Sequence, residues 1–241
     1  MHTTRSPRTA TWTKDIRIPA GDVRLEGELS LSPGARGVVL FAHGSGSGRH
    51  SPRNQLVARS LQASGIGTLL FDLLTAQEEQ VDLRTRHLRF DIDLLAQRLV
   101  HAIHWLDTSA QWIQDETGVT ELRPGFFGAS TGGGAALVAA AELGARIGAV
   151  VSRGGRPDLA GPALPKVEAP TLLIVGELDD AVIRLNEDAY AQLRCEKALT
   201  IVPGATHLFE EPGALDVVAQ LASDWFVRHL DRSIRAAENM R

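Results

Sequence analysis

A serine flanked by glycines is the feature that most constrains how this chain can fold. The segment Gly128-Ala129-Ser130-Thr131-Gly132 lies between a short strand-like run, 123–127, and an alanine-rich run, 131–143, which ends at Gly144. Flanking glycines let a strand and a helix approach closely around a sharp turn, where the serine takes strained backbone geometry with its hydroxyl exposed. A glycine is also a common helix C-cap. We therefore expect a strand, a tight turn at Ser130 and a helix.

Two later segments offer the acid and the base that a serine nucleophile requires. A serine hydroxyl needs a histidine to take its proton and a carboxylate to hold that histidine in the right tautomer. The strand-like run 171–175 leads into Gly176-Glu177-Leu178-Asp179-Asp180, and the run 199–202 leads through a Pro-Gly turn to His207. Because functional groups gather at the carboxyl ends of strands in an open α/β sheet, we expect these groups to meet Ser130 at one edge.

Taken together, these segments resemble the α/β-hydrolase fold, and more narrowly its dienelactone-hydrolase-like branch of small members without a lid. The resemblance covers roughly residues 23–230. Four segments carry it: His43-Gly44-Ser45-Gly46-Ser47 after the strand-like run 38–42, the turn around Ser130, 176–179 and 203–209.

The resemblance implies a catalytic triad of Ser130, Asp179 and His207. It also implies an oxyanion hole made by the backbone N–H groups of Thr131 and Ser45, and the Thr131 N–H opens a helix whose positive end favours negative charge. Dienelactone hydrolases use a cysteine nucleophile, whereas the matching residue here is Ser130. The family's named substrate is therefore not carried over.

Two other carboxylates compete with Asp179 for the role of the acid. Asp180 is its neighbour in the same loop, but Asp179 matches the family's position three residues after the glycine. Asp72 also follows a strand-like run, 67–71, and is better explained as a turn-forming residue.

The remaining histidines suggest no further chemistry. His43 lies where a strand becomes the oxyanion loop, and we expect it to pack and hydrogen-bond there. His50, His87 and His229 have no cysteine or acidic partners at metal-ligand spacing. We predict no metal and no cofactor.

Four arginines follow strands at the expected site edge: Arg49 and Arg53 after the oxyanion loop, and Arg153 and Arg156 after the strand-like run 147–151. An arginine there either forms a surface ion pair or orients an anionic substrate with its planar fork. We predict a substrate contact only for Arg153.

The fold expected is one α/β-hydrolase domain over residues 14–231, with a flexible segment at 1–13 and a tail at 232–241. The chain has 241 residues and 44% hydrophobic composition, enough for one sizeable core. Strand-like and helical runs alternate, which predicts a mainly parallel twisted sheet covered on both faces, with an antiparallel strand at 23–29. The stretch 153–165 is too short for a cap domain, and we expect 73–89 to be a mobile loop at the pocket edge. Helices are expected at 52–64, 86–106, 131–143, 182–194 and 213–230.

The function predicted is that of a serine hydrolase, which cleaves carboxylic esters or lactones of small soluble substrates through an acyl-enzyme. The alternatives are a hydrolase-fold ligand-binding or regulatory protein with little turnover, and an acyltransferase or thioesterase that uses the same triad. The net charge of −4 without a basic tract argues against a nucleic-acid partner. No apolar run is long enough for a bilayer, and a single cysteine favours a cytoplasmic protein.

Overall fold

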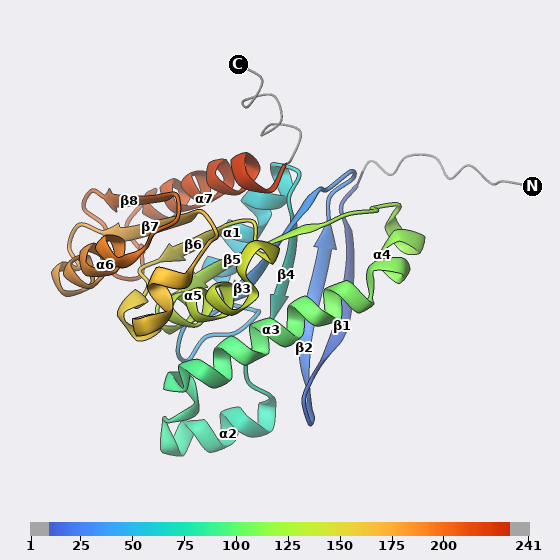
Figure 1. The fold of residues 1–241 in the computed structure, drawn as a ribbon, viewed down its shortest axis with the longest axis horizontal. Helices are drawn as coiled ribbons and strands as arrows, with labels where there is room; N and C mark the ends of the chain where they lie inside the picture. The colour runs from blue at the N-terminus through green and yellow to red at the C-terminus, as the bar shows by residue number, and fades with distance from the viewer. Residues whose placement is uncertain (1–9, 232–241) are drawn as a thin grey trace, which may run out of the picture.

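The computed structural model describes residues 10–231, which form an eight-stranded twisted sheet covered by helices (Figure 1). The strand order is β1-β2-β4-β3-β5-β6-β7-β8. The strands from β4 to β8 in this order run parallel, while β1 and β2 pair antiparallel at one edge. The strands are β1 (Trp12–Ala20), β2 (Val23–Leu31), β3 (Gly37–Ala42), β4 (Gly67–Phe71), β5 (Arg123–Ala129), β6 (Val150–Arg153), β7 (Thr171–Gly176) and β8 (Lys197–Val202).

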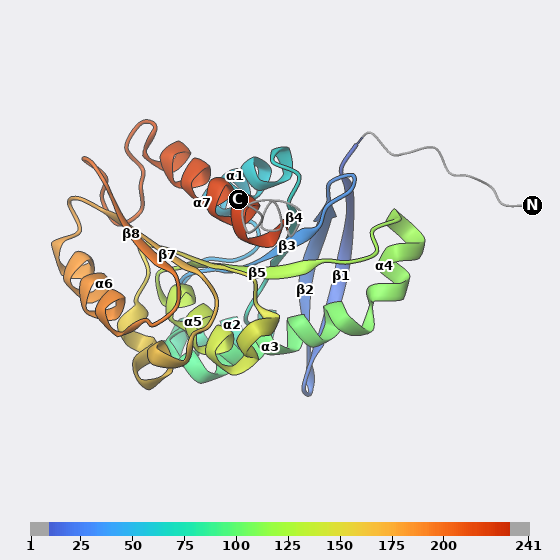
Figure 2. The ribbon, with the colours of Figure 1, turned by 45° about the horizontal axis from the view of Figure 1, so that its top comes forward.

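Helices cover both faces of the sheet, as Figure 2 shows, and enclose two apolar cores. The helices α1 (Pro52–Ala63) and α7 (Ala214–Leu230) lie on one face, and α3 (Ile92–Thr108), α5 (Thr131–Leu143) and α6 (Asp180–Gln192) lie on the other. The chain also forms α2 (Ala76–Thr85), α4 (Ala110–Thr117), η1 (Leu88–Phe90), η2 (Gly144–Arg146) and η3 (Pro157–Lys166). The expected mainly parallel sheet with helices on both faces is confirmed.

Burial follows the position of each strand in the sheet. Every residue of β3 and β7 is buried, since helices cover both of their faces, and apart from Thr171 both strands are continuous apolar runs. In the edge strand β1, burial alternates, with Ile16, Ile18 and Ala20 facing the core. Within residues 10–231, no helix is long and apolar enough to cross a membrane.

The structure corrects two expectations at the borders of the fold. The segment 1–13 was expected to lie outside the domain, but β1 begins at Trp12, which pairs with Leu31 of β2. The segment 73–89 was expected to be a mobile loop, but most of it forms α2 and η1. Residues 1–9 and 232–241 lie outside the described part of the chain.

Local sequence explains why α2 forms. Thr75 accepts a hydrogen bond from the N–H of Glu78, and the Glu78 carboxylate accepts one from the N–H of Thr75. This reciprocal capping box satisfies two N–H groups that a helix start would otherwise leave without partners. Between β6 and β7 the chain forms only the ten-residue η3, so no cap domain covers the carboxyl ends of these strands.

Candidate active site

Ser130 sits on a sharp turn between β5 and α5, with φ 50° and ψ −122°. A positive φ is strained for a residue other than glycine, and such strain persists only where the surroundings enforce it. The two flanking glycines make the turn possible. A Cβ on Gly132 would lie 2.1 Å from the carbonyl oxygen of Ala42, and one on Gly128 would lie 2.6 Å from the carbonyl oxygen of Gly132. Glycine is therefore required at both positions.

His207 and Asp179 form a hydrogen-bonded pair, with 2.6 Å between His207 Nδ1 and Asp179 Oδ2. Asp179 follows β7 and occupies the position just before α6, without a capping hydrogen bond from its side chain, whereas Asp180 is the first residue of that helix. With Nδ1–H donated to the carboxylate, Nε2 is the nitrogen free to accept a proton. Of the two rival carboxylates in this loop, the structure brings Asp179 to the histidine.

Ser130 and His207 line the same cavity, which has a volume of about 210 Å³. Within residues 10–231 no hydrogen bond joins the Ser130 hydroxyl to His207. Catalytic hydrogen bonds are often long before substrate binds and tighten in the complex. A substrate in this cavity would contact the hydroxyl and the imidazole together.

The loop that carries His207 is fixed on both sides. The Glu211 carboxylate accepts hydrogen bonds from the Thr206 N–H at 3.1 Å and from the Thr206 hydroxyl at 2.6 Å. The hydroxyl bond is the main reason that the pKa of Glu211 is below its usual value. Gly154 packs against the loop so closely that a Cβ there would lie 3.0 Å from the His207 carbonyl oxygen. These contacts position the imidazole over the cavity.

The two expected oxyanion donors lie beside Ser130. Thr131 is the first residue of α5, so its N–H has no acceptor within the helix. Gly44, next to Ser45, approaches the turn so closely that a Cβ there would lie 3.2 Å from Ser130 Cβ. Across residues 10–231, the N–H groups of Thr131 and Ser45 donate to no other backbone oxygen. Both N–H groups are therefore available to a ligand.

His43 holds the start of the oxyanion loop, as expected, through two hydrogen bonds. Its Nε2 accepts from the N–H of Leu73 at 2.9 Å, so Nδ1 carries the proton and donates to the carbonyl oxygen of Gly44 at 3.1 Å. Burial lowers the pKa of His43, which keeps the ring neutral. The ring links the ends of β3 and β4 and has no free nitrogen for catalysis.

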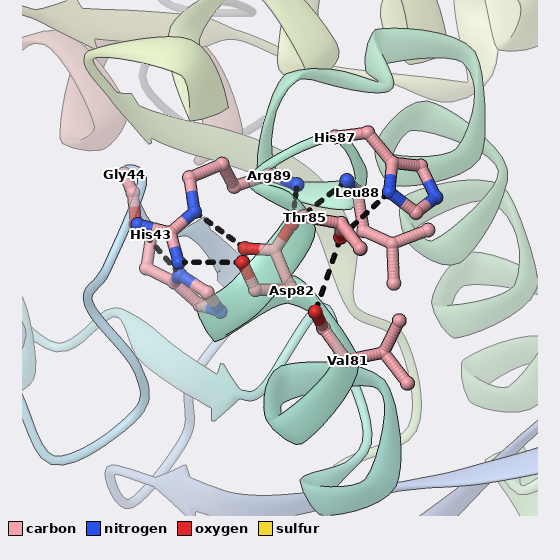
Figure 3. A network of polar contacts seen from close by, with 8 residues as sticks. All are labelled: His43, Gly44, Val81, Asp82, Thr85, His87, Leu88 and Arg89. Carbon is pink, nitrogen blue, oxygen red and sulfur yellow. Dashed lines mark hydrogen bonds and ion pairs between the residues drawn. The ribbon is translucent and has the colours of Figure 1, made fainter.

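A network of charged groups supports the far side of the oxyanion loop (Figure 3). Asp82 of α2 accepts hydrogen bonds from the N–H groups of Leu88 at 2.8 Å and Arg89 at 3.2 Å, and it forms an ion pair with the Arg89 side chain. Arg89 and His43 line a second cavity of about 610 Å³, which shares the oxyanion loop with the first. Sequence reasoning missed this network, because nothing in the spacing of Asp82 and Arg89 marks them as partners.

Asp72, the other rival for the acid, is engaged elsewhere. Its carboxylate accepts a hydrogen bond from the N–H of Arg49 at 2.8 Å and forms an ion pair with the Arg49 side chain. Asp72 thus ties the oxyanion loop to the end of β4 rather than contacting His207.

The other three arginines differ in what they contact. Arg53 pairs with Glu210 at 3.0 Å, and Arg156 forms two hydrogen bonds to Asp158 at 2.8 and 2.7 Å. Arg153 is only 6% exposed and lines the cavity that contains Ser130. In the described part of the chain it has no carboxylate partner.

No protein-family model matches the chain. A solved structure of dienelactone hydrolase from Anabaena variabilis is 59% identical, covers 92% of this chain and 99% of that chain, and has a TM-score of 0.86. Est1E from Butyrivibrio proteoclasticus shares the fold, with 15% identity, a TM-score of 0.69, and coverage of 90% of this chain and 98% of that chain.

Curated relatives come from two strains of Mycobacterium tuberculosis, and each is named "Putative phosphoribosyl transferase". Each is 54% identical over 217 residues, which is 90% of this chain and 46% of the relative. The chain therefore spans about half the length of these relatives. The high identity and nearly complete coverage of the Anabaena protein show that this chain belongs to the dienelactone hydrolase family of α/β-hydrolases.

Proposed function

We propose that this chain is a serine hydrolase that cleaves carboxylic esters or lactones of small soluble substrates through an acyl-enzyme. The observation that carries the proposal is the 2.6 Å hydrogen bond from His207 to Asp179, at a cavity that also contains the strained Ser130. An oriented imidazole beside a serine on such a turn is the arrangement that activates a serine hydroxyl.

The reaction proceeds in two halves. Ser130 Oγ attacks the carbonyl carbon while its proton passes to His207 Nε2, and the N–H groups of Thr131 and Ser45 bind the oxyanion. The intermediate expels the alcohol, which takes the proton from His207, and an ester of Ser130 remains. Water then attacks this ester, again with His207 as base, and releases the acid and the free serine.

The size of the cavity favours small acyl groups. Its volume of about 210 Å³ lies below the roughly 300–1,000 Å³ that is usual for sites of drug-sized ligands. Leu208, which is 38% exposed, gives this cavity an apolar wall. Short acyl chains and small lactones fit such a site better than long lipids do.

The name of the mycobacterial relatives does not change this proposal. It describes proteins of which this chain covers 46%, and the part they share with this chain has the hydrolase fold. We therefore assign ester hydrolysis, rather than phosphoribosyl transfer, to this chain.

Covalent labelling tests the proposal directly. The protein and its Ser130→Ala variant are treated with a fluorophosphonate, mapped by peptide mass spectrometry, and assayed with short p-nitrophenyl esters and lactones. We expect an adduct confined to Ser130, turnover by the parent protein, and neither in the variant. A folded parent protein that acquires no adduct and turns over no ester would contradict the proposal and favour a ligand-binding role.

A further inference from the structure

Arg153 is a buried cation that no carboxylate neutralises. It is the last residue of β6, it pairs in register with Ala129, and it is 6% exposed. Two nearby arginines differ from it, because each has a carboxylate partner: Arg156 pairs with Asp158, and Arg53 pairs with Glu210. Across residues 10–231 no hydrogen bond leaves the Arg153 guanidinium for another side chain. Burying a charge without a partner is unfavourable, so an anionic ligand is the natural partner for this guanidinium.

The surroundings of Arg153 hold the guanidinium in place without neutralising it. The ring of Phe209 lies 5.7 Å from it in a cation–π contact. Phe209 is fully buried and has a φ of 56°, which is strained for an aromatic residue. The adjacent Gly154 leaves no spare room here, since a Cβ on it would lie 3.4 Å from the Phe209 ring and 3.5 Å from His207 Nδ1, so the cation and the imidazole belong to one closely packed unit.

Further positive charge and several hydroxyl donors line the same cavity. Arg53 lies in the first turn of α1, and although its Nη1 binds Glu210, its buried Nε has no hydrogen-bond partner. Burial and the nearby charge of Arg53 lower the pKa of Arg153 to about 10, so Arg153 stays protonated at neutral pH. The hydroxyl groups are contributed by the Gly/Ser-rich oxyanion loop and by the residue that precedes α1: Ser45, Ser47 and Ser51.

We propose that Arg153, Arg53 and these serines form a subsite for a phosphate group, so that the substrates are phosphorylated esters or lactones. This inference rests on the proposed function. A phosphate presents three oxygens that can accept several hydrogen bonds at once, and guanidinium forks and hydroxyls are donors that suit it. A carboxylate has only two oxygens and would leave more of these donors unused. The subsite adjoins Ser130, so a phosphate bound there would hold the scissile carbonyl near the nucleophile.

A matched series of three esters tests the subsite. The substrates are 4-acetoxyphenyl phosphate, 4-acetoxybenzoate and 4-acetoxybenzamide, which carry a phosphate, a carboxylate and a neutral amide at one position of the same leaving group. We expect kcat/KM to be highest for the phosphate and lowest for the amide. In Arg153→Met, kcat/KM for the phosphate ester should fall about 10- to 100-fold more than kcat/KM for the amide does, which is the scale of a lost charge-assisted hydrogen bond.

Two further variants sharpen the result. Arg153→Lys keeps the charge without the planar fork and should give an intermediate loss for the phosphate ester. Arg156→Met removes a nearby arginine that is paired with Asp158, and it should leave the preference among the three esters unchanged. The proposal would be overturned by equal losses for all three esters in Arg153→Met, or by a wild-type preference for the carboxylate over the phosphate.

A binding measurement separates failure of this inference from failure of the proposed function. Inorganic phosphate is titrated calorimetrically into Ser130→Ala protein with Arg153 either intact or changed to Met. Binding that requires Arg153 supports the subsite, and its absence contradicts the subsite, whether or not the parent protein turns over esters. Fluorophosphonate labelling of Ser130 in Arg153→Met confirms that this variant is folded and reports separately on the serine nucleophile.

Discussion

Buried charges are paired on one side of the site and unpaired on the other. The first side, the α2 flank, is formed by α2 and η1, and the second, the His207 flank, is formed by the His207 loop and the end of β6. On the α2 flank, Asp82 pairs with Arg89 and Arg98 pairs with Glu78, so that each of these buried charges has an opposite partner. On the His207 flank, Arg153 is equally buried and lacks a carboxylate partner within the described residues. Paired charges fix the backbone of α2 and η1 beside the oxyanion loop. An unpaired buried cation destabilises the folded protein, and its position beside the nucleophile is therefore best explained by binding.

The largest expected effect is a loss of kcat when the carboxylate of Asp179, on the His207 flank, is replaced. Asp179→Asn leaves the size of the side chain unchanged but favours the wrong imidazole tautomer, and we expect kcat for a short ester to fall about 10⁴-fold. The matched control is Asp180→Asn, which alters the first residue of α6 and should change kcat less than about threefold, because Asp180 does not contact His207. Steady-state assays of both variants decide the assignment. Equal losses, or a larger loss in Asp180→Asn, would mean that the acid is wrongly assigned.

A substitution on the α2 flank should lower the free energy of unfolding rather than kcat. Asp82→Asn leaves Arg89 without its counter-ion, and breaking a buried pair from one side costs about 3–5 kcal/mol in the free energy of unfolding. Because the Arg89 side chain is 21% exposed, we expect the lower end of that range. Urea denaturation measures the loss.

An exposed pair provides the control for Asp82→Asn. Asp107→Asn breaks the Asp107–Arg146 pair, whose side chains are 46% and 39% exposed, and it should cost less than about 1 kcal/mol. The preference of Asp82→Asn for phosphorylated over neutral esters should equal that of the parent protein. A changed preference would show that the paired flank also selects substrates, and the contrast between the flanks would fail.

The sequence predicts the parts of this molecule that depend on local pattern. The strand, turn and helix around Ser130 could be predicted because glycine spacing, an apolar run and an alanine-rich run are contiguous, and α5 occupies the expected residues 131–143. Asp179 and His207 were predicted to converge because parallel strands end at one edge of a sheet. The structure brings these two side chains together, and their catalytic roles stay predictions.

The parts that were missed depend on tertiary contacts or on weak local signals. The capping box of Thr75 and Glu78 is visible in the sequence, but α2 has few apolar residues, so periodicity alone suggested a loop. Similarly, Ile16, Ile18 and Ala20 alternate with exposed residues in β1, but this apolar alternation covers only three positions and is a weak strand signal. The difference between Arg153 and Arg156 could not be predicted, because the partner of each side chain is fixed only by folding.

If Arg153 serves ligand binding rather than stability, substituting it should raise the free energy of unfolding. Burial and the nearby charge of Arg53 lower the pKa of Arg153 to about 10, which corresponds to a penalty of at most about 3.5 kcal/mol for burying the charge. The sign follows from proton binding: above about pH 10 the folded chain loses the Arg153 proton while the unfolded chain still keeps it, so the penalty is complete at pH 7 and declines only above about pH 10. We expect Arg153→Met to raise the free energy of unfolding by about 1–3 kcal/mol at pH 7, and by less at pH 10.5.

Arg156→Met is the control for this gain in stability, because it removes a cation that two hydrogen bonds to Asp158 already satisfy. It should be neutral or destabilising by up to about 1 kcal/mol. Urea denaturation at both pH values measures all three proteins. A marked destabilisation by Arg153→Met would show that the guanidinium supports the fold, and the unpaired charge would then need no ligand to explain it.

The smallest expected effect tests whether the capping box and the Asp82 ion pair stabilise the α2 flank independently. Thr75→Ala removes the side-chain acceptor of the capping box and should cost about 1 kcal/mol, whereas Thr75→Ser keeps a hydroxyl and should cost less. Thr75 and Asp82 lie near opposite ends of α2, so the losses in Thr75→Ala and Asp82→Asn should add if α2 and η1 unfold only with the whole domain. A double variant that loses clearly less than the sum would mean that Asp82→Asn already releases α2 locally. In that case, the ion pair of Asp82 would be the contact that holds this helix beside the oxyanion loop, and the cap would act only after the ion pair has formed.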